Sequence, residues 1–309
     1  MENSLLPLLF LFALSSFVSC STKEAYLFSY FEDEKDGLHL AYSYDGISWT
    51  ALNGDRPVMA PKVGEHSLMR DPSITQGPDG TFHLVWTTGW ADRIIGYASS
   101  KDLVNWSEQK AIPVMTDWEG AKNCWAPELF YDSPTKTYYI IWSTILEGDP
   151  EGMYHIYCTT TKDFETFSPT RLFFGSDRYG EIDAAIVRKP HSKELFFVYQ
   201  YASDKNDKYL CISKSTDIGQ GFPETPLRRI TSNEYWCEGG SPLFAGERFI
   251  VYFDKTWAGQ FGAVMSEDGG NTWTDISEVI SVPKGIRHGT AFKSSPSVVR
   301  SLREVLGED

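Results

Sequence analysis

The chain has 309 residues, a formal net charge of −14 and an aromatic content of 15%. This acidity argues against nucleic-acid binding, because proteins that hold phosphate backbones carry basic patches. The aromatic content favours an all-β fold, since aromatic and β-branched side chains pack well on pleated surfaces.

Residues 1–20 predict a signal peptide, because their apolar run is too short to span a bilayer and is followed by small residues. The last four, FVSC, loosely resemble a bacterial lipobox, so two outcomes stay open: lipid attachment at Cys20, or cleavage and secretion. Either outcome predicts an extracytoplasmic protein that is secreted, periplasmic or anchored by lipid at the outer membrane or cell surface. A lipid anchor would be its only membrane contact.

Four further cysteines are isolated in the sequence and form neither a disulfide framework nor a zinc-binding spacing. Cys158 and Cys211 lie in apolar, strand-like runs. We therefore expect buried thiols at these two positions.

Five segments repeat a pattern of Ser or Thr, then Asp, then an aromatic residue. They are SYDGISW, SSKDLVNW, TTKDFETF, SKSTDIGQGF and SEDGGNTW, and their aspartates stand 51 to 61 residues apart. An Asp that hydrogen-bonds its own turn after a strand is typical of a strand–turn–strand corner. A repeat of this length, built from short strands alone, predicts propeller blades of four strands each.

A second series of motifs runs between these corners at a similar period: MRDPSI, WAPELF, EIDAAIV, CEGGSPLF and RHGTAF. Their polar residues stand 50 to 57 positions apart and are Asp71, Glu128, Asp183, Glu238 and His288. The shared period predicts that each occupies the same place, at the head of the innermost strand of its blade. That strand lines the central channel, so five ionisable side chains would converge on one channel mouth.

The ends of the chain predict how the ring closes. After RHGTAF there is no room for three more strands, whereas YLFSYF, LHLAYS and ISWTAL precede the first inner strand. These N-terminal strands would complete the last blade and remove its exposed edges. We therefore predict one all-β domain, a five-bladed propeller over residues 25–295, a C-terminal tail over 296–309, and a monomer.

A single polar residue at a strand head can simply cap the strand or form a salt bridge. Three carboxylates on one rim are costly unless a function or a cation holds them together. Calcium stays open as a structural ion, although no Asp-x-Asp-x-Asp run supports a dedicated loop.

In their order and spacing, the five inner-strand motifs resemble glycoside hydrolase family 43, whose members are five-bladed propellers that act on plant-type polysaccharides. The resemblance spans roughly residues 26–292. It implies that Asp71 is the general base, that Glu238 is the general acid, and that Asp183 tunes the pKa of the acid and positions it. It also implies inversion at the anomeric carbon, and a His288 that orders water or a bound calcium ion.

The chemistry fits this resemblance, because inverting hydrolysis needs one carboxylic acid for the leaving oxygen and one carboxylate for water, roughly 6.5–9.5 Å apart. Glu238 would need a raised pKa, which a nearby ionised Asp183 would provide. No cofactor is required. The motif EGGSP departs from the EGP common in the family, so we expect Gly239 and Gly240 to affect the backbone around the acid.

Aromatic side chains beside the motifs are candidates for a sugar-binding wall. The predicted substrate contacts are Arg70, Trp90, Trp125, Glu128, Trp236, Arg287 and His288, with Trp118 and Trp257 as further candidates. The predicted partner is carbohydrate. A terminal α-L-arabinofuranoside is favoured, and a β-xyloside or a galactose-containing side chain is the alternative.

Three other functions stay open. SEDGGNTW matches the Asp-box of sialidases, but that reaction needs three arginines, and the inner-strand motifs supply only Arg70 and Arg287. A retaining hydrolase would need a nucleophile about 5–5.5 Å from the acid, and no Asn-Asp-Pro-type motif lies near the N-terminus. From a different class, the chain could be a catalytically silent carbohydrate-binding propeller, although all three catalytic positions keep an acidic residue.

Overall fold

The computed structural model describes residues 24–202, 207–225, 227–255 and 259–308. The predicted signal peptide, Cys20 and Trp257 lie outside the described residues, and the predictions made for them stay predictions. Within the described ranges, no helix is both long enough and apolar enough to cross a membrane.

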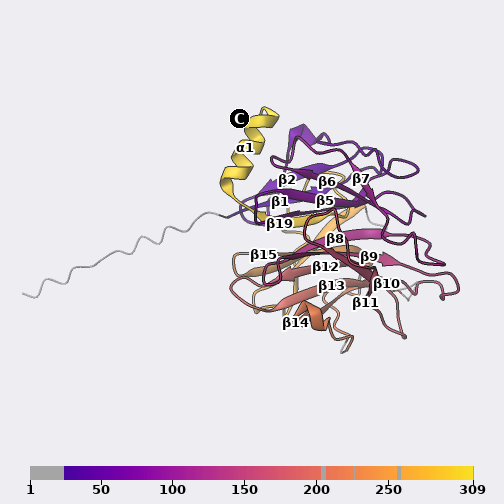
Figure 1. Cartoon of the computed structure of the whole chain (residues 1–309). Helices are drawn as coiled ribbons and strands as arrows, with labels where there is room; N and C mark the ends of the chain where they lie inside the picture. Colours follow the sequence, from indigo (N-terminus) through magenta and orange to yellow (C-terminus); the bar gives the residue numbers. More distant parts are fainter. Residues whose placement is uncertain (1–23, 203–206, 226, 256–258, 309) are drawn as a thin grey trace, which may run out of the picture.

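The described strands form five antiparallel sheets, as the repeats predict (Figure 1). Blade 1 contains β4 (Arg70–Gln76), β5 (Phe82–Thr87), β6 (Ile95–Ser100) and β7 (Lys110–Ile112). Blade 2 contains β8 (Trp125–Asp132), β9 (Thr137–Thr144), β10 (His155–Thr161) and β11 (Arg171–Phe174). Blade 3 contains β12 (Glu181–Arg188), β13 (Leu195–Tyr201) and β14 (Tyr209–Ser215), and blade 4 contains β15 (Cys237–Ala245), β16 (Arg248–Lys255), β17 (Gln260–Ser266) and β18 (Thr274–Asp275).

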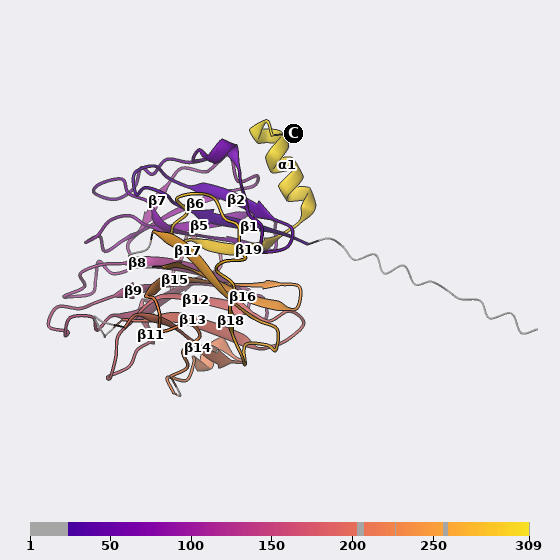
Figure 2. The same ribbon diagram turned by 180° about the vertical axis from the view of Figure 1, so that it is seen from behind.

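Blade 5 confirms the predicted ring closure. It joins β19 (Thr290–Ser294) to β1 (Ala25–Tyr30), β2 (His39–Ser43) and β3 (Thr50–Ala51). The two ends of the chain pair in antiparallel register, with Leu27 opposite Phe292, and both ribbon views place β1 beside β19 (Figures 1 and 2). Closure removes the free edges that open sheets expose.

Blade 3 departs from four full strands within the described residues. Its sheet has three strands, and an isolated bridge between Cys211 of β14 and Arg229 stands in the place of the fourth. A short 3-10 turn, η2 (Ile218–Gln220), lies between these two positions. The other short 3-10 turn, η1 (Asn53–Asp55), follows β3.

The hydrophobic core is divided into five clusters, one between each pair of neighbouring blades. For example, Phe130 of blade 2 and Phe197 of blade 3 share one cluster, while Phe28 of blade 5 and Tyr252 of blade 4 share another. The inner strands β4, β8, β12, β15 and β19 contact one another in ring order. Apolar packing between blades therefore holds the inner strands around one axis.

The repeated aspartates form the predicted corners. Ser43 donates a hydrogen bond to Asp45 Oδ1 at 2.9 Å, and the same oxygen accepts from the backbone N–H groups of Ile47 and Ser48 at 2.7 Å each. Equivalent bonds surround Asp102, Asp163 and Asp268 of the Asp-box. At the remaining corner, Ser215 donates to the carbonyl oxygen of Asp217, whose Oδ1 accepts from the N–H of Gly219. The Asp-box therefore forms a strand–turn–strand corner in this chain. The thiols of Cys124, Cys158, Cys211 and Cys237 are free and buried, which confirms the expectation for Cys158 and Cys211.

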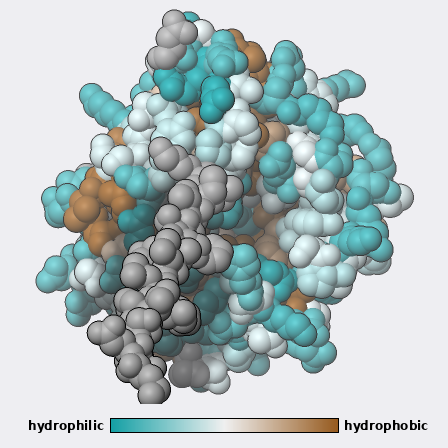
Figure 3. Space-filling model, turned by 90° about the vertical axis from the view of Figure 1, so that its left-hand side faces the viewer, coloured by the Kyte–Doolittle hydropathy of each residue, from teal (hydrophilic) through white to brown (hydrophobic). Residues whose placement is uncertain are grey.

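The predicted C-terminal tail contains a helix, α1 (Pro296–Leu306). Ser295 caps its first turn by accepting from the N–H of Val298, and Gly307 ends it at φ 74°. Val299 and Leu302 are buried against the blade 5 and blade 1 cluster. The face of the molecule seen in Figure 3 is largely hydrophilic, with apolar residues confined to small patches.

Candidate active site

Each of the inner strands β4, β8, β12 and β15 carries a β-bulge near its start. The register shifts lie between Arg70 and Ser73, Trp125 and Glu128, Ile182 and Ala185, and Glu238 and Ser241. The first extra residue of each bulge has a left-handed backbone: Asp71 (φ 51°), Ala126 (φ 46°), Asp183 (φ 53°) and Gly239 (φ 66°). Bulges re-aim side chains beside functional sites, and left-handed backbone at Asp is a strained feature that surrounding contacts must hold.

The positions of the bulges show that the five polar residues do not all occupy the same place in their strands. Asp71 and Asp183 occupy the same bulge position, and His288 stands two residues before Thr290 just as Asp71 stands two before Ser73. The prediction of one shared position is wrong for Glu128, which lies two residues further along its strand, and for Glu238, which lies one residue earlier than the bulge position. A sequence period has no means of detecting shifts of one or two residues.

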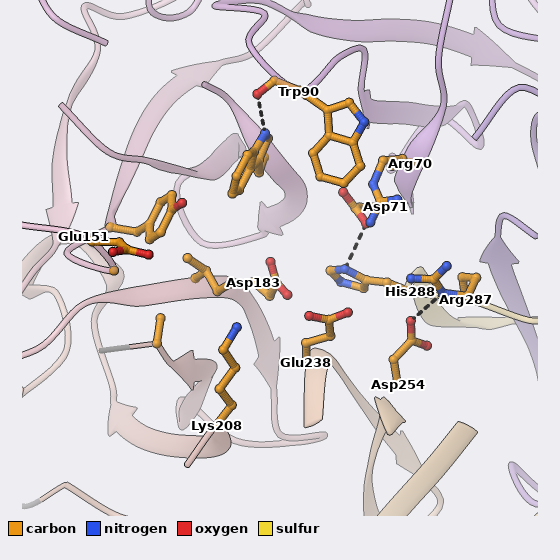
Figure 4. Close-up of a pocket in the computed structure, with 15 residues that line it drawn as sticks. Arg70, Asp71, Trp90, Glu151, Asp183, Lys208, Glu238, Asp254, Arg287 and His288 are labelled. Carbon is orange, nitrogen blue, oxygen red and sulfur yellow. Dashed lines mark hydrogen bonds and ion pairs between the residues drawn. The ribbon is translucent and has the colours of Figure 1, made fainter. Parts of the chain in front are cut away.

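A pocket of about 440 Å³ opens at this end of the channel (Figure 4). Most of its lining comes from the strand heads and from the loops between blades. The lining residues are Arg70, Asp71, Trp90, Trp125, Glu151, Gly152, Tyr154, Ile182, Asp183, Ala202, Lys208, Glu238, Asp254, Arg287 and His288. Three carboxylates from three different blades, Asp71, Asp183 and Glu238, therefore face one cavity of a size typical of small-molecule sites.

Asp71 forms an ion pair with His288, whose Nδ1 lies 3.2 Å from Asp71 Oδ1. The other oxygen accepts a hydrogen bond from Thr87 Oγ1 at 2.8 Å. Burial alone would raise the pKa of Asp71, but the hydrogen bond and positive charge of His288, with help from Arg70 and Thr87, lower it to about 2. In turn, burial would lower the pKa of His288, but Asp71 and the nearby Asp183 and Asp254 raise it to about 9. At neutral pH the pair is a carboxylate beside an imidazolium.

Asp183 has the opposite electrostatic setting. Its Oδ2 accepts one hydrogen bond from the backbone N–H of Gly239 at 3.1 Å, and its carboxylate lies near Glu238 (Figure 4). Burial raises the pKa of Asp183 to about 7; the charge of His288 opposes this rise, and the charges of Glu238 and Asp71 add to it. Asp183 therefore keeps its proton up to about pH 7, whereas Asp71 is ionised well below that pH.

Asp254 is a pocket residue that the sequence motifs do not indicate. It lies on β16 directly opposite Glu238 of β15, and its Oδ2 accepts a 3.0 Å hydrogen bond from Arg287 Nε. Burial raises its pKa to about 6, although Arg287 and His288 oppose this rise. Its only signal in the sequence is a polar residue at the end of a buried strand, VYFDK, which is a common pattern at any strand end.

Aromatic rings form one wall of the pocket, as predicted for Trp90 and Trp125. Trp125 Nε1 donates to the carbonyl oxygen of Trp90 at 3.0 Å, and its ring stacks on Tyr154 at 5.3 Å. The guanidinium of Arg70 lies 4.4 Å from the centre of the Trp90 ring, which is a favourable cation–π distance. Tyr154, Glu151 and Lys208 come from loops or strand ends whose sequences carry no motif, and the sequence did not indicate them.

Glu128 and Trp236 are not among the residues that line this pocket, in contrast to the predicted substrate contacts. Glu128 is buried in the channel, where its Oε2 accepts a 2.7 Å hydrogen bond from Thr290 of the adjacent inner strand. Burial raises its pKa to about 7. Trp118, the further aromatic candidate, lines a separate hollow with residues such as Pro169.

The calcium ion predicted near His288, held through water, stays a prediction, and a direct bond from the ring to a cation does not fit the ion pair with Asp71. His288 is paired with Asp71 as an imidazolium, and a protonated ring has no free lone pair with which to ligate a cation. No step of the chemistry below is therefore derived through a metal ion at this position.

A five-bladed propeller whose channel mouth holds an ionised carboxylate, a second carboxylate with a raised pKa, a third carboxylate beside it and an aromatic wall has the parts of a glycoside hydrolase. Residues 22–294 match the family 43-related glycosyl hydrolases, whose description reads "Probable glycosyl hydrolase domain". Because this match covers most of the chain, the protein belongs to that family and is a glycoside hydrolase.

No curated protein sequence matches the chain. Among solved structures, an α-L-arabinofuranosidase from Lactobacillus brevis is 18% identical with a TM-score of 0.53, over 67% of this chain and 72% of that one. A xylan β-1,4-xylosidase from Bacillus halodurans C-125 is 15% identical with a TM-score of 0.54, over 67% and 41% of the two chains. An exo-β-1,3-galactanase from Phanerochaete chrysosporium is 14% identical with a TM-score of 0.52, over 66% and 48%. This protein thus matches less than half the length of the last two, and the three likenesses establish the fold.

Proposed function

We propose that this protein is an inverting glycoside hydrolase that releases a terminal pentose, with α-L-arabinofuranose the favoured sugar, from plant-type polysaccharide or oligosaccharide. The observation that carries this proposal is the convergence of Asp71, Asp183 and Glu238 on one pocket. Their settings differ, since Asp71 is held ionised by His288 while burial raises the pKa of Asp183, which lies beside Glu238, to about 7. Acid–base hydrolysis needs an ionised carboxylate and a protonated one at once.

The proposed reaction assigns one proton transfer to each end of the site. Glu238 gives its proton to the glycosidic oxygen as the bond from that oxygen to the anomeric carbon breaks. Asp71 takes a proton from a water molecule whose oxygen bonds to the opposite face of the same carbon. The sugar leaves with inverted configuration, and the protons are then exchanged with solvent.

Asp183 acts on this reaction through Glu238. Asp183 is ionised above its pKa of about 7, and a negative charge beside Glu238 then favours the protonated acid. The hydrogen bond from the Gly239 N–H to Asp183 ties the bulge of β15 to that of β12. Gly239, the first of the two glycines that follow the acid, is therefore the residue through which the acid's strand is held.

The substrate class is supported by the lining of the pocket. Trp90, Trp125 and Tyr154 offer aromatic surface for the apolar face of a sugar ring. Arg70, Arg287 and Asp254 offer hydrogen-bonding groups for its hydroxyls. A β-xyloside or a β-1,3-linked galactose is the alternative substrate, since solved structures with this fold include a xylosidase and a galactanase.

The test is a screen of aryl glycosides of α-L-arabinofuranose, β-xylose and β-galactose, followed by plant oligosaccharides. Wild type, Asp71→Ala and Glu238→Gln are compared with Glu119→Gln, a control that removes an exposed carboxylate away from the pocket. We expect hydrolysis by wild type and by the control, and a loss of about 10²–10⁴-fold in both site variants.

Proton NMR of the first product then decides the stereochemistry, because inversion yields the opposite anomer before mutarotation. A product of retained configuration would contradict the role of Asp71. Binding of these sugars without hydrolysis of any of them would favour the catalytically silent propeller instead. Full activity in both site variants would refute the site assignment.

A further inference from the structure

A second cluster of ionisable side chains lies outside the pocket, in blade 5. It is formed by Glu32 and Asp36 of the loop between β1 and β2, by His39 at the start of β2, and by Asp55 of η1. Ligand atoms of Glu32, Asp36 and His39 all lie within 4.8 Å of one another. The reaction described above uses none of these residues.

His39 carries the feature that distinguishes this cluster from a group of surface acids. Its side chain is only 1% exposed, yet its Nδ1 has no hydrogen-bond partner among the described residues. That nitrogen points into the cluster, 3.9 Å from Glu32 Oε1 and 4.0 Å from Asp55 Oδ1. Both distances are too long for a direct hydrogen bond. A buried nitrogen without a partner is costly, and here it faces two carboxylate oxygens.

The two carboxylates differ in their partners, since Asp55 Oδ1 accepts a hydrogen bond from the hydroxyl of Tyr30 at 2.8 Å. Glu32 Oε1 is buried without a hydrogen-bond partner in the described part of the chain. His39 Nδ1 stands too far from Glu32 Oε1 to donate a hydrogen bond to it.

The other ring nitrogen of His39 has the partner that a metal-binding histidine requires. Nε2 lies 2.7 Å from Asp36 Oδ2. A histidine that binds a metal through one nitrogen usually donates its second N–H to a carboxylate, which fixes the tautomer and the ring orientation. With the proton on Nε2, the lone pair of Nδ1 is directed at Glu32 and Asp55.

We propose that His39 Nδ1, Glu32 and Asp55 bind a first-row divalent transition metal ion, for which Zn²⁺ is the reference, with Asp36 as the partner that orients His39. Two ligand atoms that are each about 2.1 Å from one ion can be at most about 4.2 Å apart, and the two distances from Nδ1 fall inside this limit. A donor set that includes imidazole favours zinc over calcium, which takes oxygen ligands.

A metal ion bound at this site would stabilise the part of the pocket wall that Arg70 and Arg287 form. The same loop holds the backbone N–H of Arg287 through the carbonyl of Phe31 at 2.9 Å. The guanidinium groups of Arg70 and Arg287 lie 5.0 and 5.4 Å from the centre of the Phe31 ring. A bound ion would fix the residue that follows Phe31, and through it the two arginines that line the pocket.

The test is a calorimetric titration of the chelator-stripped full chain with ZnCl₂, and in parallel with CaCl₂. We expect one Zn²⁺ per chain, a higher melting temperature in its presence, and weaker binding of Ca²⁺. Glu32→Gln should weaken Zn²⁺ binding at least tenfold, and Asp36→Asn by about 10–100-fold. Glu65→Gln, which removes an exposed carboxylate elsewhere, should bind like wild type.

Several results would overturn the proposal: no saturable Zn²⁺ binding by wild type, tighter binding of Ca²⁺ than of Zn²⁺, or wild-type affinity in Glu32→Gln. Substitution with Co²⁺ tests the ligands directly, because a thiolate charge-transfer band would place the ion on a cysteine instead. Glu32→Gln and Asp55→Asn keep the side-chain volume, so each tests one proposed ligand without creating a cavity. None of these readouts depends on hydrolysis, so they are separate from the proposed function.

Discussion

The heads of the inner strands in blades 1 and 3 differ in one decisive respect. Asp71 and Asp183 occupy the same bulge position, with φ 51° and φ 53°, yet the pKa of Asp71 is about 2 and that of Asp183 about 7. The backbone makes the two positions alike, and their neighbours make them different. Asp71 lies against a histidine cation, whereas Asp183 lies against one backbone N–H and a second carboxylate.

This difference shows how a symmetric scaffold acquires an asymmetric reaction. The propeller repeats one strand head around the channel, and each repeat brings a side chain to the same rim. The residue that the neighbouring blade places beside each carboxylate then sets its pKa: His288 lowers that of Asp71, and Glu238 adds to the raised pKa of Asp183. The proposed roles of base and modulator follow from His288 and Glu238, not from the strands that carry Asp71 and Asp183.

The largest expected effect comes from neutralising the two aspartates in turn. Asp71→Asn removes the proposed base and should lower kcat by about 10³–10⁴-fold. Asp183→Asn removes only a supporting charge and should lower kcat by about 10²-fold. Steady-state kinetics on the best substrate of the screen measures both. Equal losses in the two variants would contradict the different roles assigned to them.

Replacing His288 should remove the cause of the pKa difference between Asp71 and Asp183. In His288→Gln the burial of Asp71 persists but its cation is gone, so its pKa should rise. The acid limb of the kcat/KM profile should then move from below pH 3 to above pH 4, with a loss of activity of about tenfold or more at pH 3. An acid limb that stays in place would mean that His288 does not set the ionisation of Asp71.

Gly239 links the two regions through the backbone, and Gly239→Ala should break that link. Its φ of 66° suits glycine, and a Cβ there would stand 2.6 Å from Cγ of His288. We expect a loss of about 2 kcal/mol or more in unfolding free energy, together with reduced activity. Chemical denaturation measures the first. A stable, fully active variant would contradict the close approach of β15 to His288.

Much of this arrangement could be predicted from the sequence, because a period of 50 to 61 residues fixes blade number, ring closure and the strands that line the channel. The corners at Asp45 and Asp268 were predictable for the same reason, since their bonds are local. Glu128 was misplaced because the position of β8 that matches Asp71 is held by Ala126, and a spacing that varies by several residues does not separate the two positions. Asp254 was missed because it meets Glu238 only through the pairing of β16 with β15.

A smaller effect is expected on the pH dependence of the unfolding free energy, because the pKa of Asp183 differs between the folded and unfolded states. The folded-state pKa of Asp183, about 7, is above its value in an unfolded chain, about 3.9. The folded state therefore holds more protons between these values, and its stability falls as pH rises through this window. Asp183→Asn should remove that penalty and raise the unfolding free energy by about 2 kcal/mol at pH 8 but little at pH 4. Thermal melts at the two pH values measure this; an equal change at both would contradict it.

The smallest expected effect concerns the matching position of blade 2. Ala126 has φ 46° without any ionisable group, so Ala126→Gly should relieve left-handed strain and change stability by no more than about 1 kcal/mol. Activity should be unchanged, because Ala126 does not line the pocket. A large loss of activity would show that this bulge also positions the site.

The most direct measurement is a carboxyl ¹³C NMR titration of protein labelled at aspartate, with Asp71→Asn and Asp183→Asn used for assignment. The account predicts a resonance that titrates near pH 7 and disappears in Asp183→Asn. It also predicts a resonance that stays ionised down to about pH 3 and disappears in Asp71→Asn. An Asp71 that titrates near pH 7, or an Asp183 already ionised at pH 5, would contradict it.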